Sequence, residues 1–339
     1  MLVIRPVEKA DLDDLLRLAK MAGSGMTSLS QDSEVLAGNI ALAEESFSRL
    51  TGDRNDYFLL VMEDTDKNKV VGTSGVYAKT GSRQAFYAYR LMSVTHYSHS
   101  LEKENRSGLL HLTNDYSDCS EVGTLFLDPA YRGNGHWLSR SRYMLMAQHP
   151  ERFAVEVIAE LRGVIDEKGE SPFWNDIGAH FFGMSYDEAD RLCGKGSNQF
   201  ITELMPKYPI YTNLLSNEAR QSLGQPHQAT RRAMDLLLAE GFVYENLIDI
   251  FDAGPLVRAQ IDQIKSVRNA REARVVLLEE PGSDKTEHLM ILAKRSLDRI
   301  RIVYQPAIPD DSDIKIGSET MKALGVHEGD SIMLIDDRS

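Results

Sequence analysis

Apolar and polar positions in the first part of the chain predict a strand, two helices and a sheet. Residues 3–5 predict a short strand. Leucines and alanines within residues 9–20 then recur every three or four positions, as on one face of a helix. A second helix is predicted over residues 33–49. Residues 57–62 are a continuous apolar run typical of a buried strand, and residues 69–77 are its expected hairpin partner. We therefore expect a mixed sheet flanked by helices.

A strand, a glycine turn and a helix follow one another in the middle of the chain. Residues 121–127 predict the strand, Arg132-Gly-Asn-Gly135 the turn, and residues 138–148 the helix; residues 153–161 predict another strand. Such a turn aims several backbone N–H groups and a helix N-terminus at one point, which suits a pyrophosphate. Taken alone, the pattern fits an ordinary tight turn equally well.

The remaining pattern predicts how the chain is divided. A helix that ends in Phe-Phe or Gly-Phe and leads into a strand occurs at residues 173–184 and again at residues 230–251, which leaves an internal duplication open. After residue 255, short strand-like segments predict a β-rich end. The expected fold class is α/β (α+β), with divisions at residues 1–184, 185–255 and 256–339; the second would be a degenerate copy of the first.

Composition narrows the class of partner. The 339 residues are 42% apolar and carry 38 Lys and Arg against 51 Asp and Glu, a formal charge of −13. That sign argues against nucleic acid and anionic membranes as partners, while it is compatible with a small cationic substrate. The chain has two cysteines, no C-x-x-C pair, no apolar run of 18 residues and no secretory leader pattern. We expect no disulfide framework, no zinc site and a cytoplasmic location.

The order of these elements resembles the GNAT superfamily of acyl-CoA acyltransferases, over residues 1 to about 184. In that superfamily a turn of the form Arg/Gln-x-x-Gly-x-Gly/Ala cradles the pyrophosphate of coenzyme A. Arg132, Gly133, Asn134 and Gly135 match it here, whereas Trp137 stands where a small residue is expected. The resemblance implies a GNAT-like mixed sheet and makes these four residues candidates for binding the coenzyme.

Blocks spread over nearly the whole chain are similar to the arginine N-succinyltransferase family. They include Thr124–Pro129, Arg162–Glu167 with Ser171–Trp174, Glu203–Tyr211, Gly224–His227 and Asp249–Pro255. The resemblance implies succinyl transfer from succinyl-CoA to the α-amino group of L-arginine. It places the succinyl-CoA contact on Leu125 and the proton donor on His227. It also implies direct transfer, with succinyl-CoA as co-substrate, no tightly bound cofactor and no metal; we further expect a homo-oligomer.

Other candidates are open to two interpretations. Glu160 and Asp166 are candidates for binding a guanidinium by charge-assisted hydrogen bonds, although solvated or ion-paired carboxylates explain them too; for Glu167 we favour that simpler explanation. Cys193 as a nucleophile has no histidine partner apparent from the sequence. The alternative functions are the same fold acting on ornithine or another amine, the use of acetyl-CoA, and a non-catalytic protein that binds acyl-CoA or an amino acid.

Overall fold

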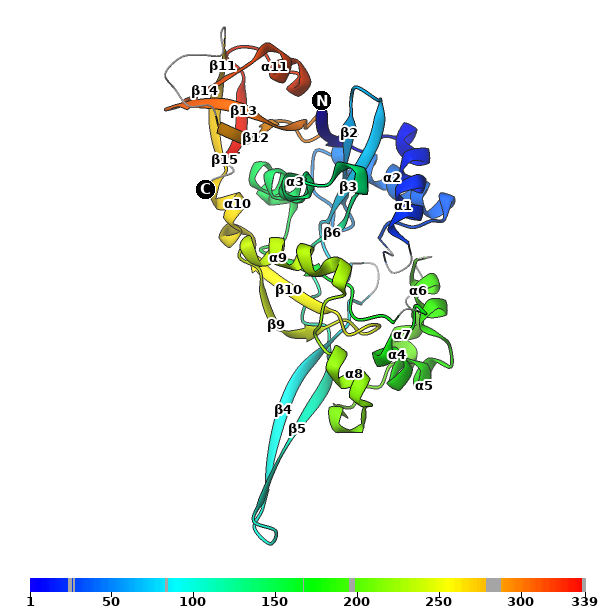
Figure 1. Cartoon of the computed structure of the whole chain (residues 1–339). Helices are drawn as coiled ribbons and strands as arrows, with labels where there is room; N and C mark the ends of the chain where they lie inside the picture. Colours follow the sequence, from blue (N-terminus) through cyan, green and yellow to red (C-terminus); the bar gives the residue numbers. More distant parts are fainter. Residues whose placement is uncertain are drawn as a thin grey trace.

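A computed structural model shows an elongated molecule built on one continuous mixed sheet (Figure 1). It describes residues 1–23, 26, 28–82, 85–166, 168–194, 199–278 and 288–336. The central strands lie in the order β1-β2-β3-β6-β7-β10-β9. Their bounds are β1 (Leu2–Pro6), β2 (Tyr57–Asp64), β3 (Lys69–Tyr77), β6 (Ser120–Leu127), β7 (Glu156–Glu160), β9 (Val243–Ile248) and β10 (Pro255–Gln260).

Helices cover both faces of this sheet. Along β2, Tyr57, Leu59 and Val61 pack in the core formed with α1 (Leu12–Ala22) and α2 (Ser33–Ser48). The alternate residues Phe58 and Leu60 pack in the core that includes α3 (Gly135–Gln148) and Leu237 of α9 (Arg231–Ala239). Because side chains alternate along a strand, a strand covered on both faces is apolar throughout, which explains the unbroken run in β2.

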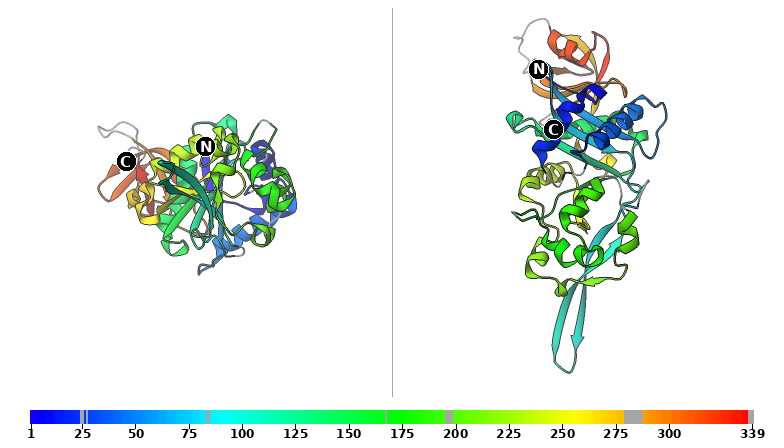
Figure 2. Two further views of the ribbon diagram at one scale, coloured as in Figure 1. Left: turned by 90° about the horizontal axis from the view of Figure 1, so that it is seen from below. Right: turned by 90° about the vertical axis from the view of Figure 1, so that its right-hand side faces the viewer.

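A long hairpin extends away from the body (Figures 1 and 2). It consists of β4 (Ala88–Ser98) and β5 (Lys103–Thr113), which pair along their whole length; β4 also pairs with β9 and β5 with β8 (Ile210–Tyr211). The hairpin exposes Met92 at the level of β8 and, near its tip, Tyr97 and Leu101. We refer to β4 and β5 as the hairpin arm.

Short helices fill the segment between β7 and α9. They are α4 (Pro172–Asp176), α5 (Gly178–Phe182), α6 (Tyr186–Gly194), α7 (Gln199–Leu204) and α8 (Asn217–Ser222). The strand expected after the Phe-Phe pair of residues 181–182 is instead a helix. Gly183 ends α5 with a left-handed backbone, and Ser185 and Glu188 exchange backbone and side-chain hydrogen bonds that start α6. A capping box, visible as Ser-x-x-Glu, therefore decides this element.

The C-terminal strands close on themselves. This part holds β11 (Arg271–Leu277), β12 (His288–Lys294), β13 (Ile302–Asp310), β14 (Asp313–Ile316) and β15 (Ser331–Asp336), with α10 (Lys265–Asn269) before them and α11 (Ser318–Leu324) among them. β12 pairs with both β13 and β15, which completes a ring, and β13 meets β1 at Ile302 and Ile4. The expected mixed sheet with a β-rich end is confirmed.

The expected divisions at residues 184 and 255 stay a prediction, for which the strand pairings give one constraint. β10 begins at Pro255 and lies between β7 and β9, so the strand that follows the second boundary belongs to the central sheet.

The 3-10 helices are η1 (Lys9–Asp11), η2 (Pro129–Tyr131), η3 (Pro150–Arg152), η4 (Thr212–Leu214), η5 (Gln228–Thr230) and η6 (Ile261–Gln263). Within the described ranges, no helix combines the length and apolarity that crossing a bilayer requires.

Candidate active site

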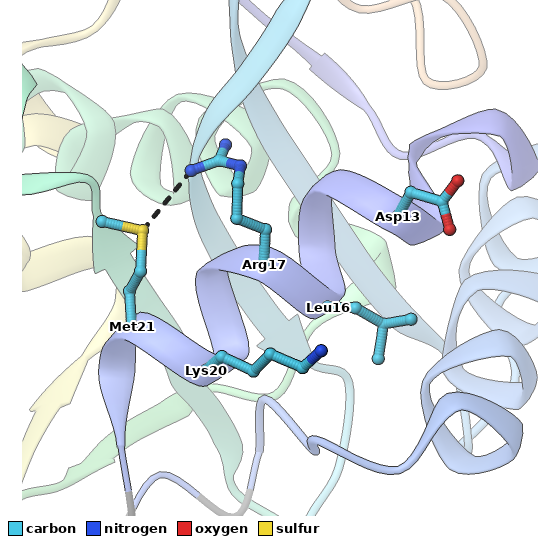
Figure 3. A pocket seen from close by; sticks show the side chains of 5 residues that line it. All are labelled: Asp13, Leu16, Arg17, Lys20 and Met21. Atoms are coloured by element: carbon cyan, nitrogen blue, oxygen red, sulfur yellow. Dashed lines mark hydrogen bonds between the residues drawn. The ribbon is translucent and has the colours of Figure 1, made fainter.

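One hollow of about 450 Å³ lies on α1 and is lined by side chains of that helix alone (Figure 3). Its arginine, Arg17, contacts the sulfur of Met21 at 3.4 Å, donates to the carbonyl of Val70 at 2.6 Å and pairs with Asp128 at 3.1 Å. The guanidinium is thus engaged in holding α1 to β3 and to the end of β6. This hollow has a structural explanation.

A second cavity, of about 500 Å³, lies where β6 and β7 separate. The two parallel strands pair at Ser120 and Glu121 and then diverge. Residues 122–126 of β6 and 159–162 at the end of β7 line the opening. Residues from the segment after α1 and from α6 also line it, as do residues of α3 and α9, so the cavity reaches both faces of the sheet. We call it the splay cavity.

A β-bulge fixes the wall of the splay cavity. The register between β3 and β6 shifts between Thr73 and Gly75, and Thr124 opposite them has a positive φ of 50°. The hydroxyl of Thr73 donates to the Thr124 carbonyl at 2.7 Å, and Tyr57 Oη lies 2.9 Å from Thr124 Oγ1. Hydrogen bonds on both sides therefore hold the unusual backbone that precedes Leu125.

The glycine turn lies between β6 and α3. Gly133 has φ +101°, and a side chain at Gly133 or Gly135 would meet nothing within 4 Å, so the turn is open to a ligand. Trp137 does not obstruct it, because the indole is buried, donates to Asn134 Oδ1 at 3.1 Å and stacks on Tyr304. Only glycine adopts such a φ without strain, and its lack of a side chain lets a ligand approach the backbone.

Three separate loops meet beside the splay cavity. The carbonyl of Arg162 accepts the backbone N–H of His227 at 2.8 Å, and the carboxylate of Asp252 accepts that of Gly163 at 2.7 Å. A side chain at Gly254 would come within 1.9 Å of the Leu161 carbonyl. Three of the blocks that carry the family resemblance are thus packed together at residues 162–166, 224–227 and 249–255.

His227 caps η5 at the edge of this site. Its Nδ1 accepts the backbone N–H of Ala229 at 3.2 Å, so in the neutral ring the proton resides on Nε2. Ala229 and Thr230, which follow it, line the splay cavity. Partial burial and then the charge of Arg162 lower the pKa of His227 below its ordinary 6.5. The ring is therefore mostly neutral at pH 7, and the imidazolium, which is the form that can donate a proton, increases as pH falls.

Carboxyl groups make one side of the cavity acidic. Burial raises the pKa of Glu121 to about 7. The Glu160 carboxyl is open to the cavity but surrounded by protein, and burial followed by the charge of Asp249 holds its pKa well above 4.5. Burial and then the charges of Asp249, Asp190 and Glu160 raise the pKa of Cys193 to about 12, so the thiol is not an activated nucleophile.

The structure brings most of the sequence candidates together. Leu125 and Glu160 line the splay cavity, His227 lies two residues before Ala229, which lines it, and residues 132–135 lead into α3, whose Ser139 and Arg142 line it. Asp166 does not line it: the side chain is exposed and accepts the backbone N–H groups of Lys168 and Glu170. Glu167 lies outside the described residues. Within the described ranges, no three His, Cys, Asp or Glu side chains are arranged to hold a metal ion.

Sequence reasoning missed Glu121, Asp249 and Arg142, all of which line the splay cavity. A signal existed for Glu121, because it is a carboxylate within an apolar strand and shares a face with Gly123 by the two-residue period. For Arg142 the signal is the apolar residues on either side of it. Leu138 and every residue from Tyr143 to Met146 are buried in α3, so a charged residue between them must also be buried.

Comparisons with known proteins identify the family of the chain. The sequence model of a family described as "Arginine N-succinyltransferase beta subunit" matches residues 2–266. Arginine N-succinyltransferases of Escherichia coli (strain 55989 / EAEC) and Shigella flexneri are each 39% identical to this chain over 337 residues, covering 99% of it and 97% of the relative.

A solved structure is similar over the same extent. Arginine/ornithine succinyltransferase subunit AI from Pseudomonas aeruginosa superposes with a TM-score of 0.89 at 34% identity, covering 99% of this chain and 98% of that one. The likeness includes the C-terminal strands that the family model does not reach. On both sequence and structure, the chain belongs to the arginine N-succinyltransferase family.

Proposed function

We propose that this chain transfers the succinyl group of succinyl-CoA to the α-amino nitrogen of L-arginine, giving N2-succinyl-L-arginine and coenzyme A. The observation that carries the proposal is the splay cavity, which joins the two faces of the sheet beside a bulge and is acidic on one side. An acyl-CoA entering from the glycine turn and a cationic amine entering from the acidic side would meet there. Family membership gives the reaction its substrates.

The coenzyme would be held by main-chain groups. Arg132, Gly133 and Asn134 precede α3 and Gly135 begins it, and the positive end of that helix favours the pyrophosphate. Leu125 lies directly after the bulge, where its backbone N–H is our candidate for the thioester carbonyl. One preorganised donor of this kind contributes about 3 kcal/mol to the stability of the transition state.

The amine would be prepared on the acidic side. Glu160, with Asp249 beside it, is our candidate for the guanidinium, since paired carboxylates favour a bidentate cation. The α-ammonium must lose a proton before attack, and Glu121, with its pKa near 7, is suited to accept it at neutral pH. Asp166 is the weaker of the two carboxylates expected from the sequence, because its own turn engages it.

The chemical step is then direct attack. The amine nitrogen forms a bond to the thioester carbon, the carbon–sulfur bond breaks, and the departing thiolate takes a proton. His227 in its imidazolium form is the candidate donor of that proton, since Ala229 and Thr230 beside it line the splay cavity, and the ring becomes neutral as it donates. No covalent intermediate on the protein is needed, in keeping with the raised pKa of Cys193.

A thiol-release assay that crosses succinyl-CoA, acetyl-CoA and butyryl-CoA with arginine, ornithine and lysine tests the proposal. We expect the highest kcat/KM for succinyl-CoA with arginine. Preference for ornithine would support the second candidate, which is favoured by the name of the Pseudomonas aeruginosa neighbour, since it includes both amino acids. Tight acyl-CoA binding without thiol release for any pair of substrates would contradict the proposal that the chain is an enzyme.

Two further proposals concern the setting of the enzyme. We propose a cytoplasmic location, which the two free cysteines support, because oxidising compartments favour disulfides. We also propose a homo-oligomer, which the exposed apolar side chains of the hairpin arm support. Light scattering during size-exclusion chromatography tests the second, and a mass equal to one chain would contradict it.

A further inference from the structure

Arg142 is a buried guanidinium without a counterion. It lies in the middle of α3, and its exposed fraction is 2%. Nε donates to the carbonyl of Ser139 at 3.0 Å and Nη2 to the Ser139 hydroxyl at 2.6 Å. In the part of the chain that the structure describes, no carboxylate comes within ion-pair distance of Arg142. Glu240 acts on it electrostatically but forms its ion pair with Arg140, at 2.8 Å.

This arrangement is unfavourable unless a ligand completes it. A buried charge is ordinarily paired, because its lost hydration is otherwise uncompensated. Arg142 and Ser139 both line the splay cavity, so an anion within it has access to the guanidinium and the neighbouring hydroxyl. Burial lowers the pKa of Arg142, which reflects the same lack of compensation.

The position of Arg142 matches the reacting end of the acyl donor. A side chain on Gly72 would lie 2.9 Å from both Leu127 of β6 and Leu138 of α3, so these two leucines are level with each other. The helix returns antiparallel to β6, and four helical residues advance about 6 Å, close to two strand residues at roughly 3.3 Å each. Arg142 is therefore level with Leu125, beside the bulge.

Resting on the proposed function, we infer that Arg142, assisted by the Ser139 hydroxyl, binds the terminal carboxylate of the succinyl group and so selects succinyl-CoA over uncharged acyl-CoA donors. The planar guanidinium suits a carboxylate because it offers parallel N–H donors. The carboxylates of Glu160 and Asp249, on the other side of the cavity, repel the carboxylate of the succinyl group and so direct the succinyl chain towards α3. Acetyl and butyryl groups offer no charge to this site.

Arg162 is the other cation that lines the splay cavity, and its surroundings differ. It acts electrostatically on Tyr186, as Asp252, Asp190 and Asp249 do, but among the described residues it forms no ion pair, and its buried Nε has no hydrogen-bond partner. Arg142 lies on the opposite side, with α9. The α-carboxylate of the substrate arginine is the second possible source of an anion, and the experiment distinguishes it from the succinyl carboxylate.

The test compares Arg142→Met with the matched control Arg162→Met. For each, kcat/KM is measured for succinyl-CoA and for butyryl-CoA, which has the same four-carbon length without the charge, with arginine as acceptor. In Arg142→Met the succinyl-to-butyryl ratio should fall by about 10²–10³-fold, the usual effect of removing one partner of a buried charge pair. The KM for arginine should stay within about threefold. In Arg162→Met the ratio should stay near that of the unmodified enzyme.

Several results would overturn the inference. They are an unchanged ratio in Arg142→Met, an equal loss with both donors, a raised KM for arginine with both donors, or loss of the ratio in Arg162→Met instead. Arg142→Met should melt at or above the temperature of the unmodified enzyme, because an unpaired charge is replaced by an apolar chain. If it fails to fold, Arg142→Lys decides, with an expected loss of about tenfold in the ratio; an unchanged ratio there would reject the inference.

Failure of the proposed function is separable from failure of this inference. Turnover of succinyl-CoA with arginine by the unmodified enzyme tests the function alone. Should that turnover be absent, calorimetric titration with succinyl-CoA and butyryl-CoA still tests the inference. A preference for succinyl-CoA that Arg142→Met abolishes supports it, and equal binding of both donors by the unmodified chain contradicts it.

Discussion

Two buried arginines close to each other in sequence show how differently one fold uses the same side chain. Arg152, in η3, is paired with the fully buried Asp56 at 2.7 Å and donates to the carbonyls of Ser46 and Arg49. Arg142, in α3, has hydrogen bonds to Ser139 and no carboxylate partner among the described residues. The first completes a structural junction, whereas the second leaves charge facing a cavity. Arg152 thus serves the fold, whereas Arg142 is our candidate for binding a ligand.

The contrast predicts that groups at the splay cavity affect turnover far more than folding. His227→Asn keeps a cap for η5 but removes the titrating ring, so we expect kcat to fall about 10²–10⁴-fold. If the imidazolium is the donor, kcat of the unmodified enzyme falls as pH rises through the lowered pKa, and the variant lacks that limb. Rapid assays from pH 5 to 8 measure both. Near-normal kcat with the same limb would exclude His227.

The ion pair should show the opposite behaviour. Arg152→Ala leaves the buried carboxylate of Asp56 without its main partner, so the free energy of unfolding should fall by about 3–5 kcal/mol. Urea denaturation followed by circular dichroism measures it. KM values of the remaining folded enzyme should hardly change. A loss below about 1 kcal/mol would remove the basis for contrasting the two arginines.

The acidic side of the cavity can be tested against a carboxylate outside it. Glu160→Gln should raise the KM for arginine about 10–100-fold, because a charge-assisted hydrogen bond contributes about 1.5–3 kcal/mol. The KM for succinyl-CoA should change much less. Asp166→Asn is the matched control, since Asp166 is exposed and engaged in its own turn. Equal effects of the two substitutions would place the guanidinium elsewhere.

The smallest expected effect concerns pH and Glu121. Unfolded chains lose this proton near the ordinary value of 4.5, while the folded chain keeps it up to a pKa of about 7. Between these values the folded state binds more protons, so the contribution of Glu121 to stability declines as pH rises and stays low above 7. Thermal unfolding at pH 5, 6, 7 and 8 should show a smaller decline in Glu121→Gln. A decline identical to that of the unmodified chain would contradict the shift.

Local patterns predicted the elements that position the site. The strand, the glycine turn and α3 are visible in residues 121–148 because their signals are periodicity and backbone freedom, which a short segment contains. Glu160 was recognised as a candidate for the same reason, as a carboxylate at the end of an apolar strand. The helix α6 was missed because its start depends on the Ser185 cap rather than on periodicity.

The charges of the cavity could not be predicted in the same way. Arg142 lies in the buried helix α3 and Arg152 in η3, which follows it. The neighbouring residues in the sequence do not show which of the two arginines forms an ion pair with an aspartate. That depends on Asp56, which comes from the start of β2, and on the separation of β6 from β7. Tertiary arrangement decides such pairings, and the pattern of one segment does not contain it.

The pairing of Ile4 with Ile302 connects the order of synthesis to the order of folding. The N-terminal strand β1 is made early, yet one of its edges has no partner until β13 has left the ribosome. Contacts between such distant positions slow folding, and an unpaired strand edge invites association with other chains. Pulse-labelled hydrogen exchange during refolding should show the β13-facing amides of β1 becoming protected together with those of β13. If the amides of β1 became protected before those of β13, this edge of β1 would not depend on β13 for its protection.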